Sequence, residues 1–443
     1  MIDKSKIPNE ALEVLDTLKE NRYDSFLVGG CVRDLILNRI PKDWDVTTSA
    51  LPEQVISLFS HVIPTRIQHG TVTVLMNNIP FEVTTFRTDG NYSDNRRPDS
   101  VQFGVSIFDD VSRRDFTINS MLFDGEQIVD YYAGLNDLEK RMIRTVGHPW
   151  VRYQEDALRM MRCIRFSCQL GFTIEEKTLE AIKDECESIK NVSWERIRDE
   201  LVKILMSDRP VQGIRLLQKS GLLKYILPEL EACVGFDQQN YHHRNDVFEH
   251  ILKVLDATDS RLNLRLSALL HDIAKPKTFS IGEDGVGHFY SHHIIGAEMS
   301  MEILKRFKFD NETINNVYIL VKEHMARYPK LRSGSTKKLI NRLGKHNIDD
   351  FIDLQLADII GSKPPYEFDN VIDLKREIKH ILEAKEPLSV KDLAVNGYDL
   401  IEIGIEPGKR MGQILNGLLE IVLKSPELNT REYLLDIVRR EYN

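Results

Sequence analysis

The sequence predicts an α+β protein, with a mixed sheet and its helices in the first third of the chain and a longer all-α region after it. Runs of β-branched and alternating apolar residues, the pattern of strands, occur before residue 147. From Tyr153 onward the apolar spacing is helical, and no further strand-rich stretch appears. The 443 residues exceed the usual size of one domain, so we expect two to four domains.

Composition places the chain among globular proteins. Hydrophobic residues make up 42% of it, and the net charge of −9 counts against a nucleic-acid partner without excluding local basic patches. The five cysteines form no C-x-x-C pair, which argues against a disulfide framework. Met1 to Arg22 has the pattern of an amphipathic helix rather than a signal peptide, and no apolar run reaches membrane-spanning length. We therefore expect a cytoplasmic protein with no membrane partner.

An acidic pair follows the first strand. Phe26 to Val28 is an apolar run typical of a buried strand, and a second short strand is predicted to carry Asp43 and Asp45. Residues two apart on a strand point to the same face, so the two carboxylates would lie side by side. Like charges that close are costly unless a cation lies between them, and hard oxygen ligands suit Mg²⁺ or Mn²⁺. The pair predicts a catalytic metal site.

A glycine turn supplies the opposite half of this site. Gly29 and Gly30 let backbone N–H groups approach a phosphate, and Arg33 adds a guanidinium for the same phosphates. A glycine loop and an acidic pair in one strand–helix–strand unit indicate a site that holds a nucleoside triphosphate through its metal ion. Either half alone would usually be a turn or a solvated strand.

Three further segments complete the predicted sheet region. Leu51 to Phe59 has the pattern of a helix, and Gly70 to Met76 with Pro80 to Phe86 has the pattern of a hairpin. Glu82 lies on its second strand, either as a third carboxylate of the metal site or as an edge charge in water. Arg87 to Val101 has no periodicity and is predicted to be a long loop of the kind that is usually functional or disordered.

The sequence G-G-x-V-R-D followed by D-W-D resembles the polymerase-β-like nucleotidyltransferases of the class II tRNA nucleotidyltransferase and poly(A) polymerase group. Residues 112–121, SRRDFTINSM, resemble the R-R-D-F-T-x-N motif of that group. The resemblance implies that Arg114 holds the triphosphate or the incoming ribose and that Asn119 supports the loop. Asp115 and Phe116 would fix the local fold.

The resemblance also gives a role to the loop of residues 87–101, which contains Asp89, Arg96 and Arg97. In the family the equivalent segment is linked to the switch from cytosine to adenine addition. This chain keeps a full-length version of it, so we expect the same role here.

Residues 155–166, EDALRMMRCIRF, are predicted to form one helix with a polar face of Asp156, Arg159, Arg162 and Arg165. For an isolated helix this would be a solvated basic stripe. Here E-D-x-x-R resembles the family's nucleotide-selection motif. Asp156 would accept the amino group of cytosine or adenine while Arg159 donates to the ring nitrogen, and uracil and guanine would present the reverse pattern. Arg162 and Arg165 remain for phosphates or for holding the helix in place.

Residues from Trp194, WERIRDEL, resemble the family's E-R-I-x-x-E motif. We expect Glu195, Arg196 and Glu200 to join helices rather than to act in catalysis.

A second constellation matches the H…HD…D signature of the HD phosphohydrolase superfamily, with His250, His271, Asp272 and Asp358 as its members. Imidazoles with carboxylates make a divalent transition-metal site, and water activated there can attack a phosphoester. Two more histidines are candidate extra ligands, His292 and His324. HD modules can also keep the fold and lose the chemistry, so both outcomes stay open.

The resemblance covers most of the chain and implies four regions. These are a nucleotidyltransferase head at 1–147, a helical neck and body with the nucleotide-selection motif at 148–235, an HD domain at 236–365 and a helical tRNA-binding region at 366–443. In the last region Lys409 and Arg410 open a helix and either bind an RNA phosphate or form an ordinary basic first turn.

The function that follows is template-independent addition of C, C and A to the 3′ end of tRNA, with CTP, ATP and tRNA as partners. Asp43 and Asp45 would hold two Mg²⁺, and Gly30, Arg33 and Arg114 would position the phosphates. The alternatives are an A-adding enzyme, a poly(A) polymerase, an HD phosphohydrolase with an inert head, and a non-catalytic tRNA-binding protein. The sequence predicts no oligomeric state.

Overall fold

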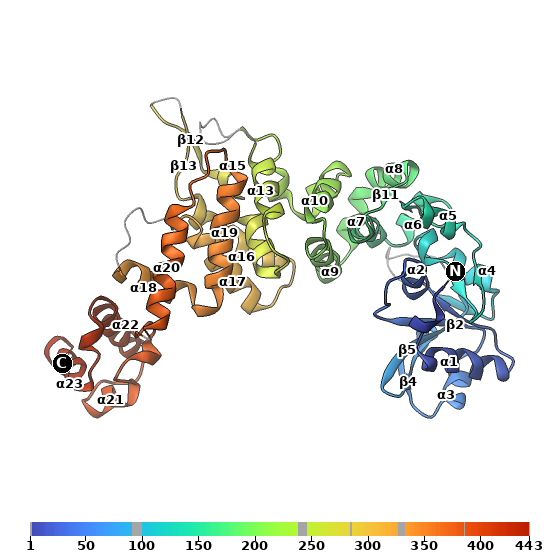
Figure 1. The fold of residues 1–443 in the computed structure, drawn as a ribbon, viewed down its shortest axis with the longest axis horizontal. Helices are drawn as coiled ribbons and strands as arrows, with labels where there is room; N and C mark the ends of the chain where they lie inside the picture. The colour runs from blue at the N-terminus through green and yellow to red at the C-terminus, as the bar shows by residue number, and fades with distance from the viewer. Residues whose placement is uncertain are drawn as a thin grey trace. The chain divides into compact units, whose positions relative to one another are not determined.

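The structure is a computed structural model that describes residues 2–90, 100–237, 246–283, 286–326, 333–384 and 386–442 (Figure 1). The chain divides into two compact units, Met1–Pro228 and Glu229–Asn443. The first unit carries the large sheet and the second is mainly helical, so the predicted α+β fold class is confirmed. The predicted long loop lies mostly outside the described residues, including Arg96 and Arg97.

The sheet of the first unit has seven strands in the order β3-β4-β5-β2-β1-β8-β9. Neighbouring strands are antiparallel except β2 and β5, which are parallel. The strand bounds are β1 (Ser25–Val28), β2 (Trp44–Thr48), β3 (Val62–Arg66), β4 (Thr71–Met76), β5 (Ile79–Thr85), β8 (Leu122–Phe123) and β9 (Ile128–Val129). The predicted first strand and the predicted hairpin are therefore present, the hairpin as β4 and β5.

Helices pack on this sheet and continue after it. The α-helices of the first unit are α1 (Asn9–Glu20), α2 (Gly30–Ile36), α3 (Pro52–Leu58), α4 (Ile107–Ser112), α5 (Gly134–Glu139), α6 (Pro149–Glu155), α7 (Leu158–Leu170), α8 (Glu176–Glu185), α9 (Trp194–Leu205), α10 (Pro210–Lys219) and α11 (Leu223–Ile226). Short 3₁₀ turns join them: η1 (Lys4–Lys6), η2 (Ile67–His69), η3 (Thr117–Asn119) and η4 (Cys186–Asn191). We call residues 2–147 the head.

Burial at helical spacing explains the first helix. Ala11, Val14, Leu15 and Leu18 of α1 are buried, and they recur every three or four residues on one face. The Ser25 hydroxyl of β1 donates to the carbonyl oxygen of Leu15 at 2.9 Å and so ties the helix to the first strand. The amphipathic helix predicted for Met1 to Arg22 is therefore present, but only over Asn9–Glu20.

The second unit is built from helices around buried apolar faces. From Pro228 its α-helices are α12 (Pro228–Glu231), α13 (Val247–Asp256), α14 (Leu262–Leu270), α15 (Lys275–Thr278), α16 (His292–Arg306), α17 (Asn311–Glu323), α18 (Ser333–Leu343), α19 (Ile348–Gly361), α20 (Asp369–Glu383), α21 (Gly397–Glu402), α22 (Lys409–Lys424) and α23 (Arg431–Glu441). Its 3₁₀ turns are η5 (Lys345–Asn347), η6 (Val390–Asp392) and η7 (Pro426–Leu428).

The all-α prediction after the head is wrong at two places. A parallel pair, β10 (Met142–Ile143) and β11 (Thr173–Ile174), joins the end of the head to a later segment. In the second unit β12 (Phe279–Ile281) and β13 (Gly287–Phe289) form a hairpin. Strands of two or three residues are too short for alternation to be visible in the sequence.

The edges of the long loop are also ordered differently from the prediction. β6 (Arg87–Asp89) and β7 (Val101–Phe103) pair antiparallel and form a separate two-stranded ribbon. The residues that were predicted to be loop at both ends are therefore strand, and the described backbone stops between them at residues 91–99.

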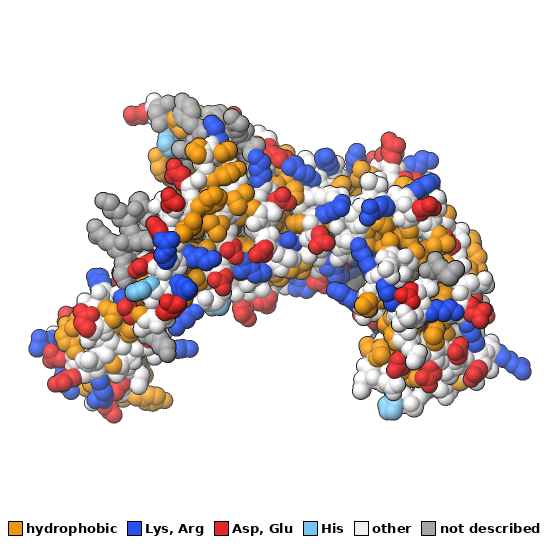
Figure 2. All heavy atoms as spheres, viewed as in Figure 1, with side chains coloured by type: hydrophobic (Ala, Val, Ile, Leu, Met, Phe, Trp, Pro, Cys, Tyr) orange, Lys and Arg blue, Asp and Glu red, His pale blue; other side chains and the backbone are white. Residues whose placement is uncertain are grey.

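Surface properties agree with the composition. On the face drawn in Figure 2, acidic and basic side chains are interspersed in both units. The five cysteines are free thiols, as expected. Among the described helices, none is long and apolar enough to cross a membrane.

Candidate functional site

The acidic residues of the head gather at the centre of the sheet. Asp45 is the second residue of β2 and lies opposite Glu82 in the parallel register of β2 and β5. Asp43 comes directly before the first strand residue, Trp44, so the prediction that both aspartates are on the strand is wrong by one position. Residues in register on neighbouring strands face the same side, so Glu82 projects on the side of Asp45.

Asp45 is held in an environment that disfavours its charge. Burial raises its pKa to about 6, the guanidinium of Arg114 opposes this, and the carboxylates of Glu82 and Asp43 raise it further. Three acidic groups therefore act on one another here, and a cation near Asp45 would relieve the repulsion. Carboxylate oxygens are the donors that Mg²⁺ prefers, so these residues fit that ion.

The glycine turn faces the same carboxylate. Gly29 precedes α2 with φ +82°, a conformation that strains any residue with a Cβ. A Cβ built on Gly29 would lie 3.6 Å from Arg114 Nη1 and 3.7 Å from Asp45 Oδ2. The turn, the carboxylate and the guanidinium therefore meet in one place, as predicted from separate motifs. Gly30 follows as the first residue of α2.

Arg33 is not directed at open solvent. It is 8% exposed, its Nη1 donates to Asn119 Oδ1 at 2.8 Å, and its Nε donates to Asp34 Oδ1 at 2.9 Å. The Asn119 amide in turn donates to Asp115 Oδ1 at 3.2 Å. Arg33 therefore joins α2 to the η3 segment, and the predicted supporting role of Asn119 has a structural counterpart in this network.

The network continues into α7. Arg162 donates to Asp115 Oδ2 through Nη2 at 2.6 Å and through Nε at 2.9 Å. Burial raises the pKa of Asp115, but the charge and hydrogen bonds of Arg162 lower it more, to about 2. The guanidinium of Arg165 lies 3.9 Å from the ring centre of Phe166 and pairs with Glu200 at 2.5 Å. These two arginines hold α7 against the head and against α9.

The predicted nucleotide-selection pair does not lie on one continuous helix. α6 ends at Glu155 and α7 begins at Leu158, because Asp156 is extended (φ −146°) and its Oδ1 accepts the backbone N–H of Leu158 at 3.1 Å. This is the hydrogen bond of a capping side chain, which ends one helix and starts the next. Only Arg159, Arg162 and Arg165 of the predicted face are within α7.

Each member of the pair is held by another residue. Both oxygens of Asp156 accept from Arg196, at 2.7 and 3.2 Å. Arg159 pairs with Glu155 at 2.5 Å and donates through Nη2 to the carbonyl oxygen of Arg113 at 3.0 Å. Arg196 therefore orients a candidate base-reading group.

Sequence reasoning missed one buried residue of this site, Asp110 in α4. It is 0% exposed and pairs with Arg113 at 2.6 Å and with Arg114 at 3.2 Å. An acid three and four residues before two arginines in a helical segment was the available signal. Without Asp110 the prediction contains Arg114, the arginine expected to contact the triphosphate, but not the carboxylate that pairs with it.

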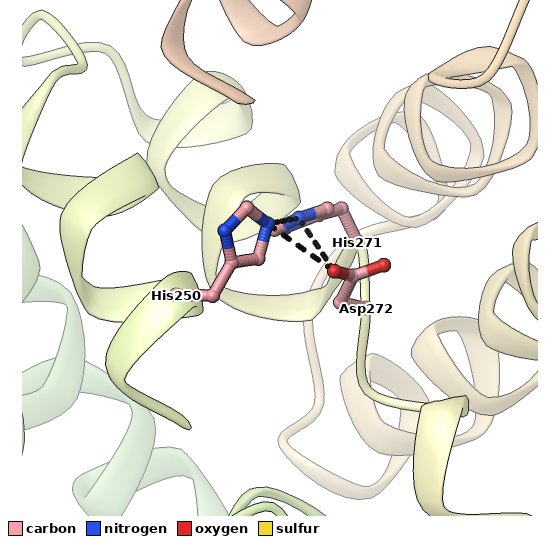
Figure 3. A group of neighbouring side chains, drawn as sticks. All are labelled: His250, His271 and Asp272. Carbon is pink, nitrogen blue, oxygen red and sulfur yellow. Dashed lines mark hydrogen bonds and ion pairs between the residues drawn. The ribbon is translucent and has the colours of Figure 1, made fainter. Parts of the chain in front are cut away.

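The predicted HD residues of the second unit converge on one point. Figure 3 shows the rings of His250 and His271 turned toward each other with the Asp272 carboxylate facing both. The two Nε2 atoms are 3.2 Å apart, and each lies 3.3 Å from Asp272 Oδ2. Asp358 of α19 is 3.1 Å from His250 Nε2.

The two candidate extra ligands lie on the other oxygen of the same aspartate. His292 Nε2 is 3.4 Å and His324 Nε2 is 3.9 Å from Asp272 Oδ1. Five of these six side chains therefore form two groups that share Asp272, one with His250 and His271 and one with His292 and His324.

The outer nitrogens of these histidines fix which nitrogen faces inward. The four Nδ1 atoms lie 2.6–3.2 Å from backbone carbonyl oxygens of Gly361, Ala268, Phe289 and Val321. A carbonyl oxygen only accepts, so each Nδ1 carries the hydrogen and the inward Nε2 is the lone-pair or second protonation site. This is the arrangement of metal-ligating imidazoles.

The charges of the cluster suit a metal site. Burial lowers the pKa of His250, but hydrogen bonds to Asp272 and Asp358 raise it to about 9. Burial and the neighbouring His271 lower the pKa of His324 to about 3. His292 Nε2 is buried and has no hydrogen-bond partner among the described residues. The donors therefore fit a divalent transition metal.

A cavity of about 860 Å³ opens over this cluster. Its lining includes Asp272 and His292 of the cluster, together with aromatic and basic side chains such as Phe289, Tyr366 and Lys363. The cavity therefore reaches part of the cluster, whereas His250 and His271 do not line it.

Comparison with known proteins identifies the family. The chain matches a Poly A polymerase head domain at residues 25–144, a probable RNA and SrmB-binding site of polymerase A at 171–234, and a tRNA nucleotidyltransferase domain 2 at 290–438. The CCA-adding enzyme of Lactobacillus helveticus is 34% identical over 429 residues, which is 96% of each chain. That of Ligilactobacillus salivarius is 32% identical over 447 residues, covering 98% of this chain and 97% of the relative.

The chain belongs to the CCA-adding enzyme family. A solved Bacillus stearothermophilus CCA-adding enzyme in complex with CTP has a TM-score of 0.72 at 27% identity, over 98% of both chains. The Thermotoga maritima enzyme complexed with tRNA has a TM-score of 0.59 at 20% identity, over 98% of this chain and 95% of that chain, and shows a shared fold.

The predicted family, enzyme class and activity are thereby confirmed. The activity is the template-independent addition of C, C and A to tRNA by a nucleotidyltransferase, with tRNA, CTP and ATP as partners. As a nucleotidyltransferase the enzyme depends on a divalent metal ion, generally Mg²⁺. The A-only, poly(A) and inert-head alternatives are not favoured.

Proposed function

We propose that the head's acidic cluster is the catalytic centre of CCA addition and that Asp43 and Asp45 hold two Mg²⁺, with Glu82 as a third carboxylate. Two observations support this. The pKa of Asp45 is raised by burial and by the nearby carboxylates of Glu82 and Asp43, and the Asp45 carboxylate lies beside the glycine turn. Bound metal ions supply activation of the tRNA 3′-hydroxyl and charge neutralisation of the leaving pyrophosphate.

Two cationic residues of the head have different tasks in this proposal. Arg114, beside Gly29 and Asp45, contacts the triphosphate, and the backbone at Gly30 accommodates the phosphates. Arg33 does not contact the nucleotide in this proposal, because its Nε donates to Asp34 and its Nη1 donates to Asn119. It supports the site indirectly, through its hydrogen bond to Asn119. Arg162 and Arg165 hold α7 through their acidic partners rather than binding phosphates.

Asp156 and Arg159 read the base. A carboxylate has about four acceptor sites, and Asp156 uses three, for Leu158 and twice for Arg196. Arg159 has five N–H donors and uses three. Asp156 therefore keeps one acceptor site, for an amino group, and Arg159 keeps two N–H donors, one of them for a ring nitrogen. This pattern accepts cytosine and adenine and rejects uracil and guanine.

The cellular location and the tRNA-binding region belong to the same proposal. The enzyme acts in the cytoplasm, where its substrate tRNA is found, and the second unit binds tRNA through its C-terminal region. Lys409 and Arg410 at the start of α22 contribute cationic groups to that region, although Arg410 Nη2 also donates to the carbonyl oxygen of Tyr442 at 2.6 Å.

One incubation series measures nucleotide addition and its base specificity directly. Transfer RNA that ends before CCA is mixed with the protein and CTP, ATP, UTP or GTP, singly and together. We expect two C residues with CTP alone and a complete CCA end with CTP and ATP. Addition of A alone to tRNA ending in CC, without C addition, would instead identify an A-adding enzyme.

We propose a metal-dependent phosphohydrolase activity for the second unit. The observation that favours it is the convergence of four inward Nε2 atoms and two carboxylates, with Asp272 shared by two ligand groups. A bound divalent metal supplies Lewis-acid activation of water for attack on a phosphoester.

Metal content tests this second activity separately from the first. The purified protein is dialysed against Mn²⁺, Co²⁺ or Ni²⁺, its bound metal is measured, and hydrolysis of a phosphomonoester and a cyclic phosphodiester is followed. We expect bound metal that is lost in His271→Ala. A wild-type protein that binds no such metal and hydrolyses neither ester would show that the cluster is only structural.

A further inference from the structure

The buried carboxylate of Asp110 binds three separate segments of the head. Its Oδ1 accepts from Arg113 at 2.6 Å (Nη2) and 3.2 Å (Nε) and from the backbone N–H of Arg87 at 3.4 Å. Its Oδ2 accepts from the Thr47 hydroxyl at 3.1 Å and from Arg114 Nη2 at 3.2 Å. One side chain therefore ties β2, the start of β6 and the arginine pair after α4.

The arginine pair lies between the two halves of the nucleotide site. Arg114 Nη1 is directed at Gly29 and Asp45, on the phosphate side. The carbonyl oxygen of Arg113 accepts from Arg159, on the base side, at 3.0 Å. Arg113 and Arg114 are adjacent, so the position of one constrains the other.

Arg114 depends on Asp110 for its orientation. Its Nε is buried and has no hydrogen-bond partner within the part of the chain that the structure describes, and its Nη2 donates to Asp110. Burial raises the pKa of Asp110, but Arg114 and Arg113 hold it below its ordinary value, so the carboxylate is charged at neutral pH.

We propose that Asp110 is a positioning residue for nucleotide addition. It directs Arg114 toward the triphosphate and holds the Arg113 carbonyl oxygen against Arg159, which keeps base and triphosphate of the incoming nucleotide in one fixed relation. This inference rests on the proposed roles of Arg114 and Arg159.

The inhibition constant for pyrophosphate measures binding at the triphosphate part of the site, since pyrophosphate occupies that part as a product. Asp110→Asn keeps the size of the side chain but removes the charge, and its NH₂ group faces donors on one side. We expect the inhibition constant for pyrophosphate, and KM for CTP and ATP, to rise by roughly tenfold because Arg114 is no longer restrained.

Asp137→Asn is the matched control. Asp137 is 1% exposed, pairs with Arg144 at 3.0 Å and accepts from the Thr117 hydroxyl at 2.7 Å, so the same kind of group is lost elsewhere in the head. We expect its inhibition constant for pyrophosphate to stay within twofold of wild type. Equal constants in wild type, control and Asp110→Asn, with only the active fraction reduced, would overturn the proposal.

Two further variants keep the test decisive. If Asp110→Asn does not fold, Thr47→Val removes one hydrogen bond from the oxygen that binds Arg114, and the pyrophosphate constant should rise at least twofold; no rise overturns the inference. Arg114→Ala separates the two claims. An unchanged pyrophosphate constant in Arg114→Ala contradicts the proposed role of Arg114. A rise in Arg114→Ala without one in Asp110→Asn contradicts only the role of Asp110.

Discussion

At the residue scale, the head's site depends on conformation and charge that single side chains supply. Gly29 provides a backbone angle of +82°, and the absence of its Cβ leaves the space between Arg114 and Asp45 free. Asp45 has a raised pKa because it is buried near two other carboxylates. A cation bound beside Asp45 would stabilise the charged form of this carboxylate, which is the basis of the proposed metal site.

Removing either aspartate should separate catalysis from binding. We expect Asp43→Ala or Asp45→Asn to abolish nucleotide addition, at least about a thousandfold, because the metal ligands serve transfer and not docking of tRNA. Incorporation of labelled CTP and a tRNA gel-shift are measured on the same preparations. Near-normal addition by either variant would remove these residues from the metal site.

Asp115 should make part of the stability of the first unit depend on pH in the acidic range. Its pKa in the folded chain is about 2 against 3.8 for the free group, so its contribution is full above about pH 4 and is lost as the pH falls through about 2. We expect Asp115→Asn to lower the free energy of unfolding by about 2 kcal/mol at pH 7 and by roughly half of that at pH 3.

Tryptophan fluorescence in urea measures this loss selectively, because Trp44, Trp150 and Trp194 are the three tryptophans of the chain and all lie in the first unit. Asp199→Asn, whose side chain is 56% exposed, is the control. A loss of the same size at pH 7 and pH 3 would show that Asp115 acts without its charge.

At the element scale, local sequence patterns were enough to predict several strands and helices of the head. The hairpin of β4 and β5, the helix α3 and the strand β1 follow from alternation, spacing and turn residues. At the break between α6 and α7, Asp156 caps α7 locally, but its carboxylate is also bound by Arg196, forty residues further along. Such a contact leaves no local pattern.

Site residues followed the same rule. Asp45, Gly29 and Arg114 were recognisable from motifs, whereas the burial of Arg33 against Asn119 is a tertiary contact between α2 and η3. The motif led us to expect that Arg33 binds phosphate, whereas in the structure its side chain is buried in the head and donates to Asn119. Asp110 was missed because its partners Thr47 and Arg87 come from distant segments.

The buried pair of Arg165 and Glu200 should fix α7 to α9. Glu200→Leu leaves a buried guanidinium unpaired and should lower the free energy of unfolding of the first unit by about 3 kcal/mol, while Arg165→Met with Glu200→Leu should recover most of it. Tryptophan fluorescence in urea and CTP addition are measured together. Recovered stability without recovered addition would assign Arg165 to phosphate binding instead.

At the scale of the whole molecule, two units carry two separate sites. The acidic cluster lies in Met1–Pro228 and the histidine cluster lies in Glu229–Asn443. Each cluster is complete within its own unit, since all of its side chains come from that unit. The two proposed sites can therefore be disabled one at a time.

Replacing His271 and Asp272 together by Ala should remove bound transition metal and any phosphoester hydrolysis while CCA addition stays within about twofold of wild type. The reason is that these two residues belong to the second unit, whereas the proposed catalytic residues all lie in the first unit. Addition rates and metal content are compared with those of Asp45→Asn, which should show the opposite pattern. A large loss of CCA addition in the double variant would mean that the clusters are coupled.

The central claim is that Asp156 and Arg159 select the base in place of a nucleic-acid template. The direct measurement is kcat/KM for CTP, ATP, UTP and GTP with Asp156→Ala, with Arg159→Ala and with the exposed control Asp199→Ala. Loss of one hydrogen bond in a desolvated pocket costs about 1–3 kcal/mol, so selectivity against UTP and GTP should fall by roughly one to two decades in Asp156→Ala. Arg159→Ala should weaken CTP and ATP together. A uniform drop with unchanged ratios among the four nucleotides would contradict base selection by these residues.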